Sequence, residues 1–245
     1  MKNKKVIIAT VNSKKDLYSF TADEFAAVAP NIHLGLLHAY LKSKGVDVEI
    51  IEADVDMVPM NQLIDILKQK NPLLFGVICS GVNPSSSTMT MAGVVDFFEF
   101  FHKSDLDIKT FIWGGHPTVL PERSLNETGV DFIVRGEGFE TLEKLYDALC
   151  HDTDLTGIPG LSYFESDQQE KKTFLQTPDA ALIEDLDTLP RIDWELMNPA
   201  RYRAHNWHCF GDINQRSPYA IIWTSFGCPY KCSYCSTNNL FGKRG

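Results

Sequence analysis

Apolar residues follow two alternating patterns along the first 150 residues of the chain. Short runs that are apolar throughout, or that alternate with polar residues, predict β-strands. Segments in which apolar residues recur at helical spacing predict helices between those strands. The predicted strands are Val6–Ala9, Val46–Ile51, Leu73–Cys79, Thr110–Trp113 and Phe132–Val134, and the predicted helices are Ile32–Lys44, Met60–Lys70, Thr90–Phe101, Pro121–Glu127 and Glu140–Leu149.

Five strands that are each followed by a helix predict an α/β fold. The expected architecture is a doubly wound, Rossmann-like or flavodoxin-like, five-stranded parallel sheet. Asn31 is a suitable N-cap for the first helix, and Gly45 is a suitable stop. Within Val46–Ile51, apolar residues alternate with Asp47 and Glu49, which indicates a strand near the edge of the sheet.

The pattern changes after residue 155. Residues 156–215 contain two short strand candidates, Leu161–Phe164 and Thr173–Leu175, among many aromatic residues, so we interpret this stretch as an ordered connector. A further strand is predicted at Tyr219–Thr224, just before a cluster of cysteines. The expected organisation is a first domain at 1–155, a connector at 156–215 and the start of a second domain at 216–245, which would be the first strand and cysteine loop of a barrel.

Charge and hydropathy exclude some classes of function. The formal net charge of −9 disfavours nucleic acid as a partner, because phosphate binding needs clustered Lys and Arg. No apolar run approaches the roughly 20 residues that a membrane helix needs. Polar residues from Asn12 onward also interrupt the N-terminal apolar run before it could serve as a signal peptide. We therefore expect a cytoplasmic protein without a transmembrane segment.

The loops that follow strands one, three, four and five are rich in glycine and small polar residues. In a doubly wound sheet, ligands bind beyond the carboxyl ends of the strands, so these loops predict a cofactor site. The alternative is that they only form tight turns. No G-x-G-x-x-G follows the first strand, which disfavours a dinucleotide. The predicted cofactor-binding residues are Thr10, Asn12, Ser80, Gly81, Val82, Asn83, Gly114, Gly115, His116, Pro117, Arg135, Gly136, Glu137 and Gly138.

His116 allows two interpretations. It could ligate a metal or a corrin, or contact an amide of a cofactor. It could equally be a turn histidine held by bonds to the backbone, because no second ligand lies at a metal-binding spacing.

Three of the six cysteines lie within eight residues as C-x3-C-x2-C, at Cys228, Cys232 and Cys235. Three thiolates in so short a loop can hold one iron–sulfur cubane and leave its fourth iron open to a substrate. The alternatives are a zinc site completed by Cys209 or His208, and three unrelated core cysteines.

Residues 226–235, Phe-Gly-Cys-Pro-Tyr-Lys-Cys-Ser-Tyr-Cys, resemble the cluster motif of the radical S-adenosylmethionine (SAM) superfamily. The resemblance implies that Cys228, Cys232 and Cys235 hold a [4Fe-4S] cluster as metal ligands. The open iron would bind the amine and carboxylate of SAM, and electron transfer would cleave SAM to methionine and a 5′-deoxyadenosyl radical. It also implies that Tyr234 lies beside the adenine.

The upstream sequence resembles the cobalamin (B12)-binding domain of the B12-dependent branch of this superfamily. The matching stretches are Pro30–Leu36, Gly114–Thr118, Val134–Gly138 and Leu186–Pro190. The Asp-x-His-x-x-Gly motif that supplies an axial histidine in other B12 proteins is missing, as is common in this branch. The resemblance therefore implies cobalamin bound base-off, without a protein imidazole.

The resemblance further implies methyl transfer to unactivated carbon, or rearrangement or cyclisation of a carbon skeleton. The substrate would be a small or lipid-like molecule, and a flavodoxin or ferredoxin would supply electrons. The chain stops ten residues after Cys235, so we expect a truncated piece, inactive alone, with no catalytic residue assigned. The alternatives are a non-catalytic module that binds a corrinoid or zinc, and a nucleotide-binding regulatory domain, which the missing G-x-G-x-x-G disfavours.

Overall fold

A seven-stranded sheet forms the centre of the computed structural model, which describes residues 4–12, 26–81, 86–166, 171–205, 209, 212 and 214–243. The strand order is β2-β1-β3-β4-β5-β6-β7, and the first five strands are parallel. The last two pair antiparallel. The strands are β1 (Val6–Thr10), β2 (Val48–Glu52), β3 (Leu74–Cys79), β4 (Lys109–Gly114), β5 (Phe132–Val134), β6 (Leu161–Ser166) and β7 (Lys172–Gln176).

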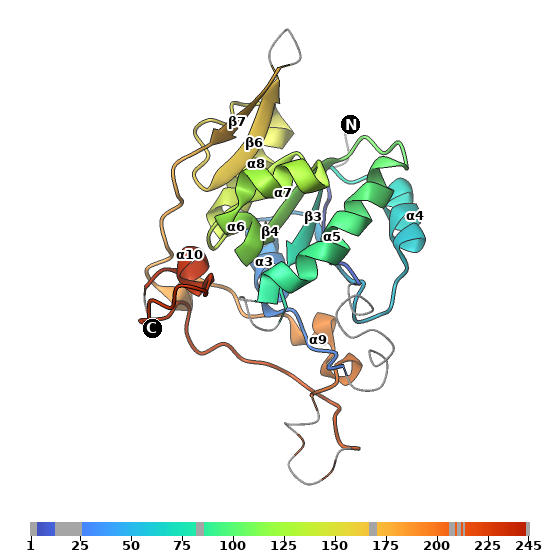
Figure 1. The fold of residues 1–245 in the computed structure, drawn as a ribbon. Coiled ribbons are helices and arrows are strands. Elements are labelled where there is room, and N and C mark those ends of the chain that lie inside the picture. The colour runs from blue at the N-terminus through green and yellow to red at the C-terminus, as the bar shows by residue number, and fades with distance from the viewer. Residues whose placement is uncertain are drawn as a thin grey trace.

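Helices cover both faces of the sheet (Figure 1). The longer ones match the predicted segments within a few residues. In the described residues, none of them is long and apolar enough to cross a membrane. The helices are α3 (Ile32–Ser43), α4 (Met60–Lys70), α5 (Ser87–His102), α6 (Gly115–Val119), α7 (Pro121–Thr128), α8 (Phe139–His151), α9 (Trp194–Met197) and α10 (Thr237–Phe241), with short 3-10 turns η3 (Leu186–Thr188) and η4 (Pro199–Arg201).

The two-residue period of the strands divides the core into two layers. Val6 and Ile8 of β1 pack in the layer that contains residues of α3 and α8. Ile7 and Ala9 pack in the opposite layer, with residues of α4 and α5. Every residue of β1 and β3 is buried, as expected for central strands covered on both sides. The predicted edge position of β2 is confirmed.

Three segments differ from the predicted pattern. The two strand candidates of the expected connector form β6 and β7, so the sheet continues past residue 155 and has seven strands rather than five. Residues Gly115–Val119 form a short helix where a loop is predicted. Tyr219–Thr224 forms no strand, because no described strand lies beside it to satisfy its backbone groups.

Candidate functional site

The parallel strands β1, β3, β4 and β5 end at one side of the sheet, which we call the carboxyl edge. The chain runs from β1 to β2 on one side and then crosses back to β3 on the other side of β1, so the strand order reverses between β1 and β3. Ligands of open α/β sheets bind outside the carboxyl ends at such a reversal. The structure therefore brings the four predicted loops to one edge, although binding by their residues stays a prediction.

The end of β1 is tied to the loop after β2. Thr10 is buried, and its hydroxyl donates a hydrogen bond to Asp54. Asn12 Nδ2 lies 3.7 Å from Met57 Sδ. Ser13, which follows in the predicted loop, lies outside the described residues.

The end of β3 is held by the helix that follows β1. Asn31 caps α3 by accepting a hydrogen bond from Leu34 N at 3.1 Å, and its Nδ2 donates to the Ser80 carbonyl at 3.0 Å. Asn31 thus fixes the β3 loop as well as the helix start, a role that the sequence alone does not show. A Cβ at Gly81 would lie 2.6 Å from Ser86 Oγ, so the hydroxyl of Ser86 would have to rotate away from a larger residue there. Val82 and Asn83 lie outside the described residues.

The end of β4 carries Gly114, Gly115, His116 and Pro117. A Cβ at Gly114 would lie 2.1 Å from the Cys79 carbonyl oxygen, so β3 and β4 end in close backbone contact. Ser87 bridges this contact, because its hydroxyl donates to the Cys79 carbonyl and accepts from His116 N at 3.0 Å.

The His116 ring is only partly satisfied by the protein. Nδ1 lies 3.2 Å from Thr88 Oγ1, while Nε2 is buried and has no hydrogen-bond partner within the described part of the chain. Burial lowers the pKa of the imidazole, so the ring is neutral at pH 7. His116 thus lies in the first turn of α6, and its contact with a cofactor stays a prediction.

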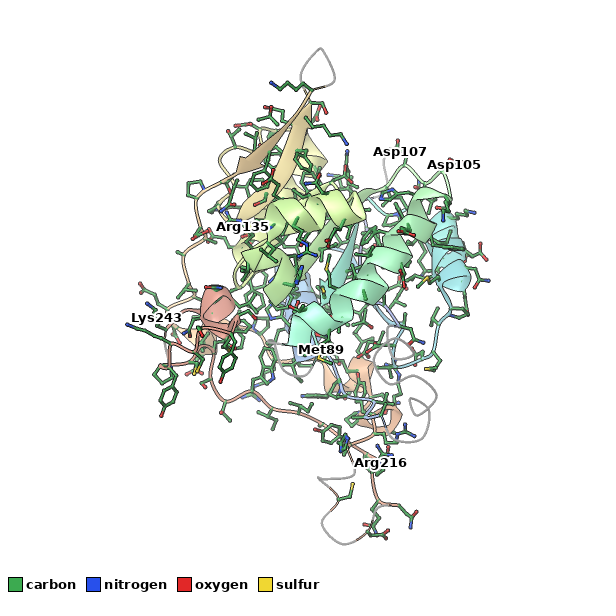
Figure 2. All side chains as sticks on the ribbon, viewed as in Figure 1. Met89, Asp105, Asp107, Arg135, Arg216 and Lys243 are labelled. Carbon is green, nitrogen blue, oxygen red and sulfur yellow. The ribbon has the colours of Figure 1, made fainter. Side chains whose placement is uncertain are left out.

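The loop after β5 contacts later parts of the chain. Arg135 (labelled in Figure 2) is buried, forms an ion pair with Asp179 and donates to a backbone carbonyl after β7. The buried Glu137 carboxylate accepts from Ile183 N at 2.7 Å. Gly136 N donates to an α6 hydroxyl at 3.3 Å. Arg135 and Glu137 thus hold the connector against the loop after β5. Contact of this loop with a cofactor stays a prediction.

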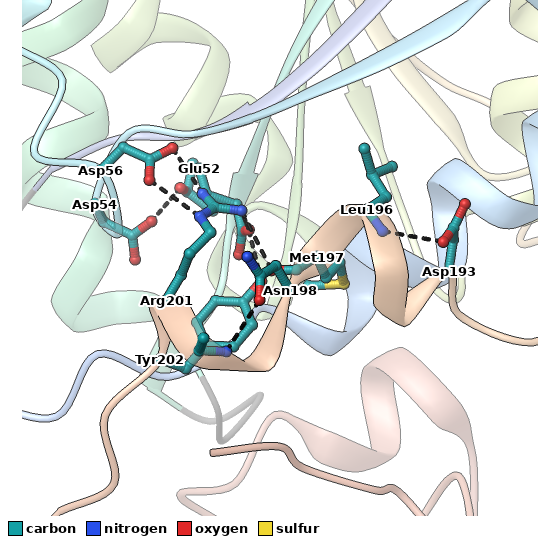
Figure 3. A network of polar contacts seen from close by, with 11 residues as sticks. Glu52, Asp54, Asp56, Asp193, Leu196, Met197, Asn198, Arg201 and Tyr202 are labelled. Atoms are coloured by element: carbon teal, nitrogen blue, oxygen red, sulfur yellow. Dashed lines mark hydrogen bonds and ion pairs between the residues drawn. The ribbon is translucent and has the colours of Figure 1, made fainter. Parts of the chain in front are cut away.

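A buried carboxyl group that the sequence analysis does not single out lies at the end of β2 (Figure 3). Glu52 is 2 % exposed, accepts from Tyr202 Oη at 2.7 Å and lies 3.2 Å from Arg201 Nη1. Arg201 also pairs with Asp56 at 2.6 Å. Burial raises the pKa of Glu52 to about 7. The available signal was an acidic residue directly after Ile50 and Ile51, and this residue anchors the connector beside Thr10.

The three clustered cysteines lie in a surface segment. Cys228 and Cys235 are partly exposed and Cys232 is exposed, and all three are free thiols. In the described residues, no group of three His, Cys, Asp or Glu side chains is arranged to hold a metal ion. Hydrogen bonds with Thr237 lower the pKa of the Cys235 thiol. Cluster binding stays a prediction.

The structure also describes most of the other residues that the cluster and zinc interpretations involve. Tyr234 is 89 % exposed, and His208 lies outside the described residues. Cys209 is partly buried, with its sulfur 3.7 Å from two backbone carbonyl oxygens. Cys79 is fully buried in the core.

Comparison with known families identifies the domain that contains the parallel strands. The B12 binding domain matches residues 18–146, which is more than half of the chain.

Two curated relatives cover most of the chain. An uncharacterized methyltransferase of Pyrococcus horikoshii is 29 % identical over 199 residues, which is 81 % of this chain and 39 % of the relative. The anaerobic magnesium-protoporphyrin IX monomethyl ester cyclase of Synechocystis sp. is 28 % identical over 214 residues, covering 86 % and 39 % of the two chains. The chain therefore spans about two fifths of the length of these relatives.

Two solved structures share the fold. The radical SAM methyltransferase TsrM of Kitasatospora setae, with cobalamin and a [4Fe-4S] cluster bound, has a TM-score of 0.63 at 19 % identity. It is matched over 99 % of this chain and 43 % of its own. The cobalamin-dependent SAM radical enzyme OxsB, with aqua-cobalamin bound, has a TM-score of 0.58 at 18 % identity, covering 93 % and 27 % of the two chains.

Proposed function

Because the chain belongs to the family of B12-binding domains, we propose that its carboxyl edge binds cobalamin. The observation that carries this proposal is the family match over 18–146, which contains β3, β4 and β5 and the loops after them. The strand-order reversal between β1 and β3 places those loops where such a sheet binds ligands.

The residues at the edge fit a corrin. A corrin is broad and flat, and its rim carries amides that need hydrogen-bond partners. Ser80, Gly81, Gly114 and Gly115 have small side chains or none, so they place no bulky group over a flat face. Nε2 of His116, which has no partner in the described part of the chain, would exchange one hydrogen bond with a rim amide or with the nucleotide tail.

The end of β1 offers no axial imidazole. The first histidine of the sequence is His33, which is fully buried and stacked on Trp113. We therefore infer that cobalamin is held base-off by contacts around its rim, with the lower cobalt face free of protein nitrogen.

For the longer protein, we propose a B12-dependent radical SAM enzyme. Cys228, Cys232 and Cys235 would ligate a [4Fe-4S] cluster, and Tyr234 would lie beside the adenine of SAM. When bound, the cluster supplies an electron to SAM and cobalamin carries a methyl group. The names of the relatives, a methyltransferase and a cyclase, support methyl transfer or ring formation. We propose an unactivated carbon of a small or lipid-like molecule as the target. A flavodoxin or ferredoxin would deliver the electron.

Titration of the chain with hydroxocobalamin, followed by absorption, tests the cobalamin proposal. We expect saturation below tens of micromolar, an ordinary range for a cofactor. His116→Ala should weaken binding about threefold to tenfold, because one hydrogen bond contributes about 1 kcal/mol. The control His151→Ala, at the exposed end of α8, should bind as the parent chain does.

Two outcomes would contradict these expectations. Absence of binding at tens of micromolar would leave a domain that has kept the fold and lost the corrin. Electron paramagnetic resonance of the cob(II)alamin form should show no nitrogen superhyperfine splitting from the protein. Splitting that disappears in His116→Ala would instead establish axial ligation by His116.

A further inference from the structure

Three buried rings from separate elements pack together in a group to which the cobalamin proposal assigns no role. His33 of α3 lies flat on Trp113 of β4, with ring centroids 3.4 Å apart and an interplanar angle of 5°. Phe139, at the start of α8, packs beside the His33 ring at 5.1 Å. None of the three is more than 1 % exposed. We call His33, Trp113 and Phe139 the aromatic platform.

The loop after β5 fixes the orientation of the platform. Trp113 Nε1 donates to the Gly136 carbonyl at 2.8 Å, and His33 Nε2 lies 2.9 Å from the Glu137 carbonyl oxygen. Burial lowers the pKa of His33 well below its ordinary value, so the neutral ring can donate from Nε2. Gly138 has φ +81°, and a Cβ there would lie 2.7 Å from the Trp113 ring. Glycine is therefore required for this loop to close on the platform.

The cysteine segment, residues 226–241, is seated on this platform at both of its ends. Phe226, two residues before the first cysteine, stacks on Phe139, with ring centroids 6.4 Å apart and an interplanar angle of 9°. Phe241, six residues after the last cysteine, lies 6.0 Å from the His33 ring. The two phenylalanines also contact each other at 4.8 Å, which closes the segment into a loop.

The middle of the cysteine segment is more exposed than its ends. Phe226 and Phe241 are 7 % and 2 % exposed, whereas Tyr230 and Tyr234 between them are 73 % and 89 % exposed. The helix that ends the segment, α10, packs against α6, the helix that contains His116 (Figure 1). The cysteine segment is therefore anchored next to α6, the helix that begins at the end of β4.

We propose that the aromatic platform is the docking surface for the cysteine segment, and that His33 is a positioning residue that fixes the cysteine loop beside the carboxyl edge. The inference rests on the proposed function, since it places the cluster ligands next to the cobalamin site. A methyl carrier and an electron carrier can act on one substrate only if the protein holds the two groups at a fixed separation.

Hydrogen exchange on the full chain without cofactors tests the docking. Phe241→Ala removes a ring of the cysteine segment and leaves the platform intact. We expect amide exchange, read by mass spectrometry of peptides, to become at least tenfold faster across 226–241 and to stay unchanged in β1 and β3. Tyr230→Ala is the matched control, because it removes an exposed ring from the same segment. Equal acceleration in the sheet, or none in the segment, would overturn the proposal.

His33→Phe separates positioning from packing. Phenylalanine keeps a flat ring against Trp113 but cannot bond the Glu137 carbonyl. We expect exchange in 226–241 to rise severalfold while α4 and α5, in the other layer, exchange as before. Exchange in the segment identical to that of the parent chain would show that the ring alone suffices and that His33 has no positioning role.

Magnetic coupling between the two cofactors would report whether the docked segment holds the cluster near cobalamin. After reconstitution with iron, sulfide and cobalamin, electron paramagnetic resonance should show coupling between the reduced cluster and cob(II)alamin. The coupling should weaken in Phe241→Ala and persist in Tyr230→Ala, and coupling of unchanged size in Phe241→Ala would refute the inference. If cobalamin fails to bind, the proposed function fails, while hydrogen exchange still decides whether the platform docks the segment.

Discussion

Glu52 contacts the connector, and its titration makes the stability of the fold depend on pH. Its carboxyl group is almost fully buried beneath Tyr202 and Arg201, and burial outweighs the attraction of Arg201 in raising its pKa from 4.5 to about 7. The folded protein therefore binds this proton more tightly than the unfolded chain does. The stability that Glu52 contributes is full below about pH 4.5 and is lost as the pH rises through about 7.

Replacing this carboxyl group should remove that dependence. Glu52→Gln keeps a hydrogen-bond acceptor for Tyr202 and cannot ionise. Between pH 5 and pH 8 the parent chain should lose on the order of 2 kcal/mol more unfolding free energy than Glu52→Gln, by the usual conversion of a pKa shift. Thermal melts at the two pH values measure this difference. Glu122→Gln, at an exposed site on α7, is the control. A parent-like pH profile in Glu52→Gln would show that other groups set it.

At the scale of elements, the sequence predicts the five parallel strands and the longer helices well, because both faces of the sheet are covered. Continuous apolar runs such as β3 and helical apolar spacing in α3 follow directly from that burial. The alternation in β2 correctly places it at the edge. These signals are local to each element, so they survive without knowledge of its neighbours.

The sequence does not predict elements whose structure depends on contacts with residues far away along the chain. Gly115–Val119 contains both glycine and proline and is predicted as a loop, but Ser87 accepts the His116 amide and helps to fix a helical turn. The strand candidates at β6 and β7 are correct as strands, yet nothing local says that β6 pairs with β5. The apolar run at Tyr219–Thr224 has strand character and no neighbouring strand among the described residues.

The junction of β4 and α6 allows a test of this tertiary dependence. In Gly114→Ala, the new Cβ would lie 2.1 Å from the Cys79 carbonyl oxygen and 2.8 Å from Ser87 Oγ, so the ends of β3 and β4 must separate. We expect a loss of about 2 kcal/mol in unfolding free energy, typical of overpacking, with weaker cobalamin binding. Denaturant melts measure the first and titration the second. Gly157→Ala, where a Cβ meets nothing within 4 Å, should change neither, and parent-like stability in Gly114→Ala would refute the close contact.

At the scale of the whole molecule, one part of the candidate site can be identified from the spacing of residues in the sequence. The other part depends on contacts that exist only in the folded protein. The C-x3-C-x2-C spacing identifies the three thiols directly. The seating of their segment on His33, Trp113 and Phe139 depends on rings far apart in sequence, so no motif predicts it. The structure thereby links the two proposed cofactor sites through one packed interface.

The last prediction concerns which thiols bind iron. After anaerobic reconstitution with iron and sulfide, Cys228→Ala, Cys232→Ala and Cys235→Ala should each lose bound iron, because a cubane held by three thiolates cannot keep its site with two. Cys150→Ala is the control, since Cys150 lies near the end of α8, outside the cysteine segment. Cys79 should not substitute for a lost ligand, because burial raises the pKa of its thiol and keeps it protonated in the core. Iron and sulfide analysis, with visible absorption, measures the result. Full iron content in Cys232→Ala would refute the cluster assignment, and zinc bound in place of iron would favour a metal-binding module without SAM chemistry.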